Sequence, residues 1–150
     1  MFNIFIILQL KYYESTPMKK QISLSVKCPF CGKLLMDEEE RIHDKPSIRL
    51  NIQTKQERGV IYLCSIYECY DYKTEVPLQE KEVVEFTCPH CNKELNTKEE
   101  CQSCHAPMVA LLLTTGGRVS LCSRTGCPNH YVAFEDLATE LQKFYETFGS

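Results

Sequence analysis

Cys28-Pro-Phe-Cys31-Gly-Lys-Leu-Leu is the stretch that decides the fold, because Cys88-Pro-His-Cys91-Asn-Lys-Glu-Leu repeats it later in the chain. A second cysteine pair follows each stretch, Cys64-x4-Cys69 in the first copy and Cys122-x4-Cys127 in the second. The two pairs are separated by 32 residues in the first copy and by 30 residues in the second. Matching order and spacing indicate an internal duplication, with the boundary near residues 77–82.

Both copies show the same alternation of apolar and polar residues between their cysteine pairs. Residues 48–52 and 109–113 alternate in this way, which predicts half-buried strands, and each is followed by a turn-rich segment and a second strand. The apolar residues of 70–76 and 131–134 can add a third strand to each hairpin. The chain is therefore predicted to be small, β-rich and metal-stabilised.

The end of the chain has a different pattern. Five apolar residues recur at helical spacing between charged and amide side chains: Phe134, Leu137, Leu141, Phe144 and Phe148. This stripe predicts a C-terminal amphipathic α-helix at 134–150. We expect the helix to pack on its own ribbon. The alternative is a seam for a protein partner or a second copy of the chain.

The start of the chain is apolar over residues 1–10, but no basic residue precedes this run and it is too short to span a bilayer. We expect residues 1–17 to be a non-native or disordered extension. With no export signal, the protein is expected in the cytoplasm, away from membranes, with reduced thiols. The predicted organisation is then two tandem zinc ribbons, at 18–80 and 81–133, followed by the helix.

Ten cysteines in a chain of 150 residues point to metal binding in a reducing compartment. Zinc prefers four ligands in a tetrahedron, and two knuckles brought together by a hairpin supply four thiolates. We therefore expect one site made of Cys28, Cys31, Cys64 and Cys69. Iron is the less favoured metal for such a site, because the C-x4-C pair is unlike a rubredoxin knuckle.

The second copy leaves the choice of ligands open, because it holds six cysteines: Cys88, Cys91, Cys101, Cys104, Cys122 and Cys127. Three choices of ligands are possible. Cys88 and Cys91 can share a metal with Cys101 and Cys104, Cys101 and Cys104 can share one with Cys122 and Cys127, or Cys88 and Cys91 can share one with Cys122 and Cys127. Each choice leaves one pair over. The pair left over could recruit His90, His105 or His130, so the expected content is two or three Zn²⁺ ions. His43 occupies the position of Cys104 in the first copy.

Two family resemblances cover parts of the chain. The segment from Cys28-Pro-Phe-Cys31 to Cys69 and the segment from Cys101-Gln-Ser-Cys104 to Cys127 resemble the C-terminal zinc ribbons of type IA topoisomerases. The segment from Cys88 to Cys104 resembles the short double zinc-ribbon modules of many bacterial proteins. The first resemblance implies binding of single-stranded DNA, on which aromatic rings would stack beside basic residues. The candidates are Tyr62, Tyr67, Tyr70, Tyr72, Arg49, Arg58 and Lys73.

Charge favours a protein partner over nucleic acid. The formal net charge is −3, and two sites of four thiolates around one Zn²⁺ would bring it to about −7, whereas phosphate binding needs a basic surface. No arrangement of residues suggests an enzyme, since an all-cysteine zinc site is closed. The sequence thus predicts a non-enzymatic module that binds zinc and a protein partner, with single-stranded nucleic-acid binding or an iron redox role as alternatives.

Overall fold

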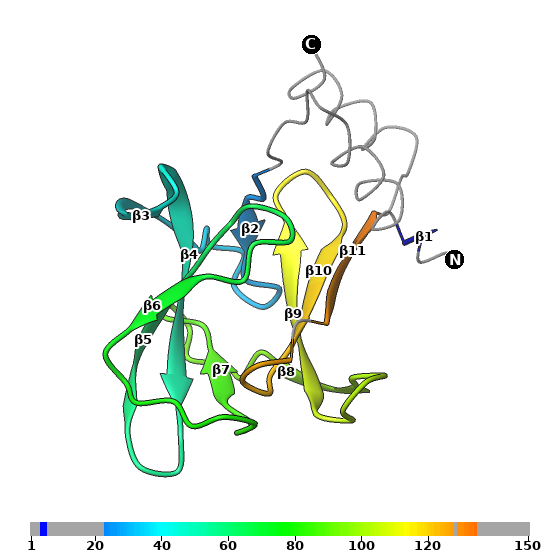
Figure 1. The fold of residues 1–150 in the computed structure, drawn as a ribbon. Coiled ribbons are helices and arrows are strands. Elements are labelled where there is room, and N and C mark those ends of the chain that lie inside the picture. The colour runs from blue at the N-terminus through cyan, green and yellow to red at the C-terminus, as the bar shows by residue number, and fades with distance from the viewer. Residues whose placement is uncertain (1–3, 6–22, 128, 135–150) are drawn as a thin grey trace, which may run out of the picture.

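The computed structural model describes residues 4–5, 23–127 and 129–134, which form eleven β-strands (Figure 1). They are β1 (Ile4–Phe5), β2 (Val26–Lys27), β3 (Met36–Ile42), β4 (Lys45–Gln53), β5 (Arg58–Leu63), β6 (Tyr72–Thr74), β7 (Glu85–Thr87), β8 (Asn96–Glu100), β9 (Pro107–Leu113), β10 (Arg118–Cys122) and β11 (His130–Phe134). The predicted β-rich character is confirmed for these residues. The helix predicted at 134–150 lies outside them, except for Phe134, which ends β11.

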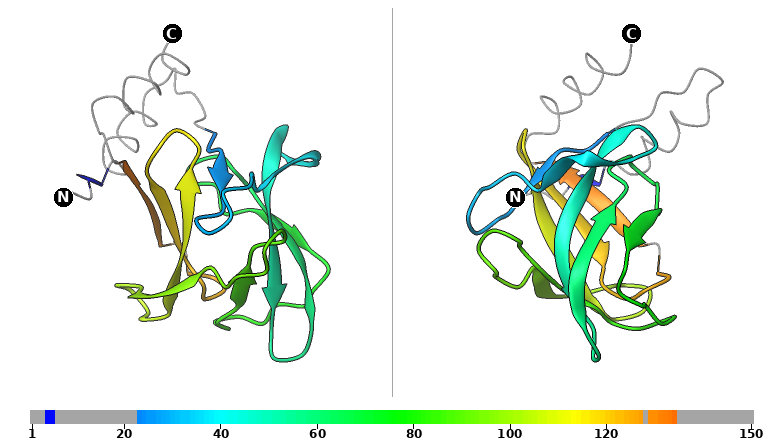
Figure 2. Two further views of the ribbon diagram at one scale, coloured as in Figure 1. Left: turned by 180° about the vertical axis from the view of Figure 1, so that it is seen from behind. Right: turned by 90° about the vertical axis from the view of Figure 1, so that its left-hand side faces the viewer.

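The strands form two antiparallel sheets that lie side by side (Figure 2). One sheet has the order β1-β11-β10-β9-β2, and β8 also pairs with β9. The other has the order β3-β4-β5-β6, and β7 also pairs with β4. The third strands predicted for each hairpin are present, as β6 beside β5 and β11 beside β10.

Each sheet takes a short strand from the other copy of the repeat. β2 comes from the first copy but pairs with β9 of the second, and β7 comes from the second copy but pairs with β4 of the first (Figure 1). The bounds 18–80 and 81–133 remain predictions for the two ribbons. Because of the exchanged strands, each sheet contains residues from both ranges.

The exchange is stabilised by burial of apolar side chains from both copies in one core. Val26 of β2 is opposite Leu113 of β9, and Phe86 of β7 is opposite Ile52 of β4. All four side chains are buried. Complete burial of a side chain of this size contributes about 1.5–3 kcal/mol, so two-residue and three-residue strands can hold their places.

Outside the exchanged strands, β1 pairs with β11, so residues 4 and 5 of the expected extension contact the fold. The rest of 1–17 lies beyond the described residues. Within the described part of the chain, no helix is long and apolar enough to cross a membrane.

Candidate metal centres

Four cysteines from the two exchanged knuckles meet where the copies cross. The sulfurs of Cys28, Cys31, Cys88 and Cys91 all lie within 4.8 Å of one another. Cys28 Sγ is 3.8 Å from Cys91 Sγ, and Cys31 Sγ is 3.8 Å from Cys88 Sγ. Tetrahedral zinc with bonds of about 2.3 Å to sulfur separates its ligands by about 3.8 Å. These four residues, the shared site, therefore have the spacing of a zinc–tetrathiolate centre.

Local hydrogen bonds hold each knuckle of the shared site in the same shape. Cys28 Sγ accepts from the backbone N–H groups of Phe30 and Cys31, at 3.3 and 3.5 Å between N and S. Cys88 Sγ accepts in the same way from His90 and Cys91. The residue after the second cysteine of each knuckle has a left-handed backbone: Gly32 has φ 75° and Asn92 has φ 65°. Asparagine tolerates this region better than most residues, so it can replace glycine here.

The interior position of the shared site affects the protonation of its ligands. Burial raises the pKa of the Cys88 thiol to about 12, because the thiolate loses its hydration. A metal ion binds the thiolate and neutralises its buried negative charge. Because the thiol is protonated in the absence of metal, metal binding must displace the proton. The affinity of the shared site for metal should accordingly fall as the pH is lowered.

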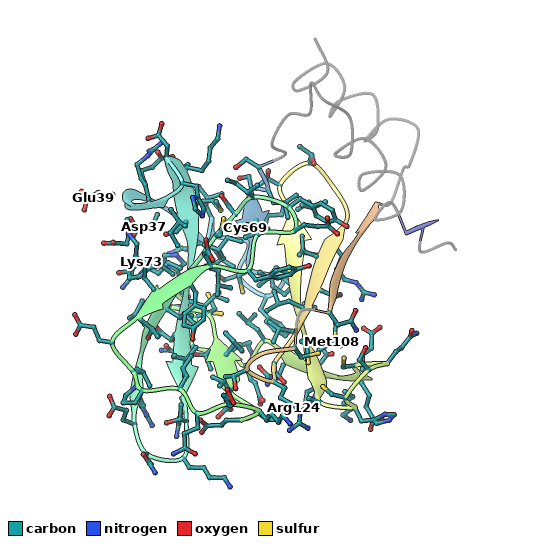
Figure 3. The ribbon with its side chains drawn as sticks, in the orientation of Figure 1. Asp37, Glu39, Cys69, Lys73, Met108 and Arg124 are labelled. Carbon is teal, nitrogen blue, oxygen red and sulfur yellow. The ribbon has the colours of Figure 1, made fainter. Side chains whose placement is uncertain are left out.

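A second set of four cysteines lies wholly in the second copy. Cys101, Cys104, Cys122 and Cys127 have all sulfurs within 4.8 Å of one another. Cys101 Sγ is 3.8 Å from Cys127 Sγ, and Cys104 Sγ is 3.4 Å from Cys122 Sγ. We call this set the second-copy site. Met108 and Arg124, labelled in Figure 3, flank it on β9 and on the turn after β10.

Cys101 differs electrostatically from Cys122 and Cys127, whose pKa values are raised by burial. Burial acts to raise its pKa, but its sulfur accepts hydrogen bonds from Asn129 Nδ2, at 3.2 Å, and from backbone N–H groups including that of Ser103. These bonds stabilise the thiolate and together lower the pKa to about 6. Cys101 is therefore a thiolate near neutral pH and a ready first ligand for an incoming metal ion.

The four-cysteine set expected in the first copy is wrong in one respect. Cys28 and Cys31 do not meet Cys64 and Cys69, because β2 carries the first knuckle to the other sheet, where it faces Cys88 and Cys91. In the second copy, the structure contains one of the three partitions left open, that of Cys101 and Cys104 with Cys122 and Cys127.

Cys64 and Cys69 instead meet a histidine. One ring nitrogen of His43 and both sulfurs lie within 4.8 Å of one another. Cys69 is labelled in Figure 3 on the connection between β5 and β6. We call these three residues the first-copy cluster. The sequence pointed to His43 through its equivalence with Cys104. It did not predict that His43 would meet Cys64 and Cys69.

Among the described residues, neither His105 nor His90 is brought to a cysteine cluster. His105 is exposed, and its Nδ1 is 3.8 Å from Glu100 Oε1. His90 Nε2 is 3.2 Å from the Leu34 carbonyl oxygen, across the shared site. His130 lies on β11, and its side chain is outside the described part.

The residues proposed for base stacking do not form one exposed platform. Tyr67 is only 3% exposed, so the expected stacking role is wrong for that residue. Tyr62 and Arg49 are paired across β5 and β4 and are half-buried. Tyr70 and Arg58 are exposed. Tyr67 lies in the turn after Cys64, where its ring packs into the core and is not available for stacking.

An apolar cavity of about 310 Å³ lies between the sheets. It reaches both the first-copy cluster and the second-copy site, since Cys64, Cys69, Cys122 and Cys127 are among its lining residues. Exposed Tyr70 and Tyr72 also line it, with an apolar wall that includes Leu24, Ile61, Leu63, Leu78, Phe86 and Leu121. An opening of this composition suits an apolar group better than a phosphate.

The comparisons with known proteins give one match. A family model described as tRNA synthetases class I (M) matches residues 37–148. No curated protein matches the chain, and no solved structure does. The resemblance to topoisomerase ribbons is not confirmed by these comparisons, whereas the cysteine clusters fit zinc ribbons.

Proposed function

The chain belongs to the family of class I tRNA synthetases (M), and on that premise we propose that it is a non-enzymatic zinc module of the family that binds a protein partner. Its cysteine clusters provide the scaffold, and the surface around the apolar cavity provides the contact. The proposal places the protein in a reducing, cytoplasmic setting, where cysteines stay available as metal ligands.

The observation that carries the proposal is the pair of four-cysteine sets. Four thiolates fill the coordination sphere of Zn²⁺ and leave no position for a substrate or an activated water. Such a centre stabilises the fold and takes no part in a reaction. The shared site joins the two copies where their strands cross, so its metal would stabilise both sheets at once.

A protein partner is favoured by charge and by the exposed aromatic residues. The net charge of −3 becomes about −7 with two zinc–tetrathiolate centres, which repels phosphate. Tyr70 and Tyr72, 52% and 50% exposed, stand at the apolar cavity. Tyrosine is enriched at protein interfaces, where its ring packs and its hydroxyl stays hydrated.

Nucleic-acid binding is the second candidate, and one local feature favours it. Phe30 is 58% exposed on the shared-site knuckle, and Lys93 Nζ lies 5.8 Å from the centre of its ring. A ring beside ammonium groups is the arrangement on which unpaired bases stack. Lys33 is exposed on the same knuckle.

Two measurements on the reduced, zinc-loaded chain separate these functions. We expect no amino-acid-dependent exchange of pyrophosphate into ATP and no micromolar binding of tRNA or single-stranded DNA at physiological salt. Amino-acid activation would overturn the non-enzymatic proposal. Micromolar binding that weakens steeply with rising salt, and that Phe30→Ala abolishes, would establish the nucleic-acid function instead. Lys55→Ala, in the exposed turn between β4 and β5, is the matched control for the loss of a surface side chain far from the knuckle.

A further inference from the structure

We propose that His43, Cys64 and Cys69 bind a third Zn²⁺, with one coordination position left for an external ligand. This site goes beyond the two closed centres on which the proposed function rests. Three protein ligands with an open fourth position are a regular zinc arrangement, and Cys2His is one of its ligand sets.

The backbone around Cys64 and Cys69 repeats that of the second-copy site. Cys69 N–H donates to the Ile66 carbonyl at 3.0 Å, as Cys127 N–H donates to the Arg124 carbonyl at 3.2 Å. The knuckle turn has a left-handed residue in both, Glu68 with φ 67° and Gly126 with φ 85°. The first copy thus keeps a metal-binding knuckle even where glutamate must adopt the glycine-favoured conformation.

A single residue accounts for the missing fourth ligand. The seryl hydroxyls after the second strands fix the correspondence, since Ser65 Oγ donates to the Pro46 carbonyl and Ser123 Oγ to the Pro107 carbonyl, both at 2.6 Å. Arg41 pairs with Pro46 as Glu100 pairs with Pro107, so the next residue along the strand, Ile42, takes the place of Cys101. Ile42 is 6% exposed. Its side chain packs with Cys64 and Ile66.

His43 is held by a carboxylate, as zinc-binding histidines usually are. Its Nε2 is 2.6 Å from Asp71 Oδ2, while Asp71 itself is not a member of the cluster. The Asp71 carbonyl accepts from Cys64 N–H at 2.9 Å, as the Asn129 carbonyl accepts from Cys122 N–H at 3.1 Å. Asp71 therefore stands where Asn129 supports the second-copy site.

Exposure and charge separate this centre from the closed ones. Zn²⁺ with two thiolates and a neutral imidazole has no net charge, whereas a zinc–tetrathiolate centre carries two negative charges. The His43 side chain is 51% exposed, and Cys64, Cys69 and Asp71 line the apolar cavity. The fourth position is therefore open to water, an anion or an external thiolate, and the ion exchanges faster than in the closed centres.

The test is a zinc count by elemental analysis on the reduced full-length chain after removal of loosely bound metal. We expect three Zn²⁺ in the wild type, two in His43→Ala and three in His105→Ala. His105 is the matched control because it occupies the corresponding hairpin, has a left-handed backbone as well, and lies outside every cluster of the described residues. Two Zn²⁺ in the wild type, or three retained in His43→Ala, would overturn the third site. The two closed centres would stand in both cases.

Ile42→Cys gives a gain-of-function test that does not depend on losing a ligand. With a chromophoric chelator in excess, one of three Zn²⁺ should leave the wild type at least about tenfold faster than the other two, because its fourth position is open to attack. Ile42→Cys should supply the fourth thiolate and remove this fast phase. Uniform release from the wild type, or a fast phase unchanged in Ile42→Cys, would count against the proposal.

Discussion

Single side chains next to the cysteines set how readily each thiol gives up its proton. Asn129 donates to Cys101 Sγ at 3.2 Å and helps bring the pKa of Cys101 to about 6, whereas burial raises that of Cys64 to about 12. Residues that support ligands commonly alter metal affinity 10–100-fold without touching the metal. Asn129 and Asp71 occupy the same place in the two copies and differ in charge.

Asn129→Ala should weaken zinc binding at the second-copy site about tenfold at pH 7. Loss of the N–H···S bond raises the Cys101 pKa, so more protons must be displaced by the metal, and the deficit should grow as the pH falls towards 6. Competition with a chelator of known affinity measures it. Gln102→Ala, an exposed change in the same hairpin, is the control. A deficit independent of pH would show that Asn129 does not act through the thiolate.

At the scale of the elements, the close approach of β5 to the segment after β6 leaves no room for a side chain. A Cβ added at Gly59 would collide with Val76 Cγ2, and Val76 is 5% exposed. The neighbouring hydrogen bond from Thr74 Oγ1 to the Val60 carbonyl, at 2.8 Å, holds the two segments at this distance. The position of β6 beside β5 therefore depends on a glycine.

Gly59→Ala should destabilise the zinc-loaded protein by about 1–3 kcal/mol, the usual cost of overpacking a well-packed core. Urea denaturation followed by circular dichroism measures the change. Gly59→Ala combined with Val76→Ala should be less destabilised than the sum of the two single variants, because the second change removes the clashing methyl group. Additive effects would place the cost of Gly59→Ala elsewhere.

For the whole molecule, the exchange of β2 and β7 makes the two copies one unit. Each sheet lacks a strand without the other copy, and the shared site takes two ligands from each. Stability thus cannot be divided between the ribbons.

Chelation under reducing conditions should therefore unfold both sheets together. In NMR spectra, amide signals from β5 and from β10 should disappear at the same chelator concentration, because removal of the shared metal releases both exchanged knuckles. Signals of either sheet that persist after verified loss of all metal would contradict this cooperativity.

The sequence predicted the individual strands and hairpins more successfully than it predicted which strands pair and which cysteines meet. Apolar alternation and turn residues located the hairpins and the third strands at 70–76 and 131–134, since these are local properties. The sequence did not predict that Cys28 and Cys31 meet Cys88 and Cys91, because the two repeats carry equivalent knuckles. Either copy could supply the two thiolates that complete the site. Two-residue β2 gives no local signal of its choice of β9. Burial of Tyr67 was missed because alternation does not tell which tyrosine faces the core.

The division of the shared site between the copies has a consequence during synthesis. A nascent chain that has emerged only as far as the end of the first repeat presents Cys28 and Cys31 as two thiols without their partners, and this state lasts until Cys91 leaves the ribosome. During that interval the first half cannot complete the shared site or its sheet, because Cys88, Cys91 and β7 belong to the second copy. The Cys28 and Cys31 thiols, without a metal, are then exposed to oxidation. The protein therefore depends on a reducing environment most strongly during its synthesis.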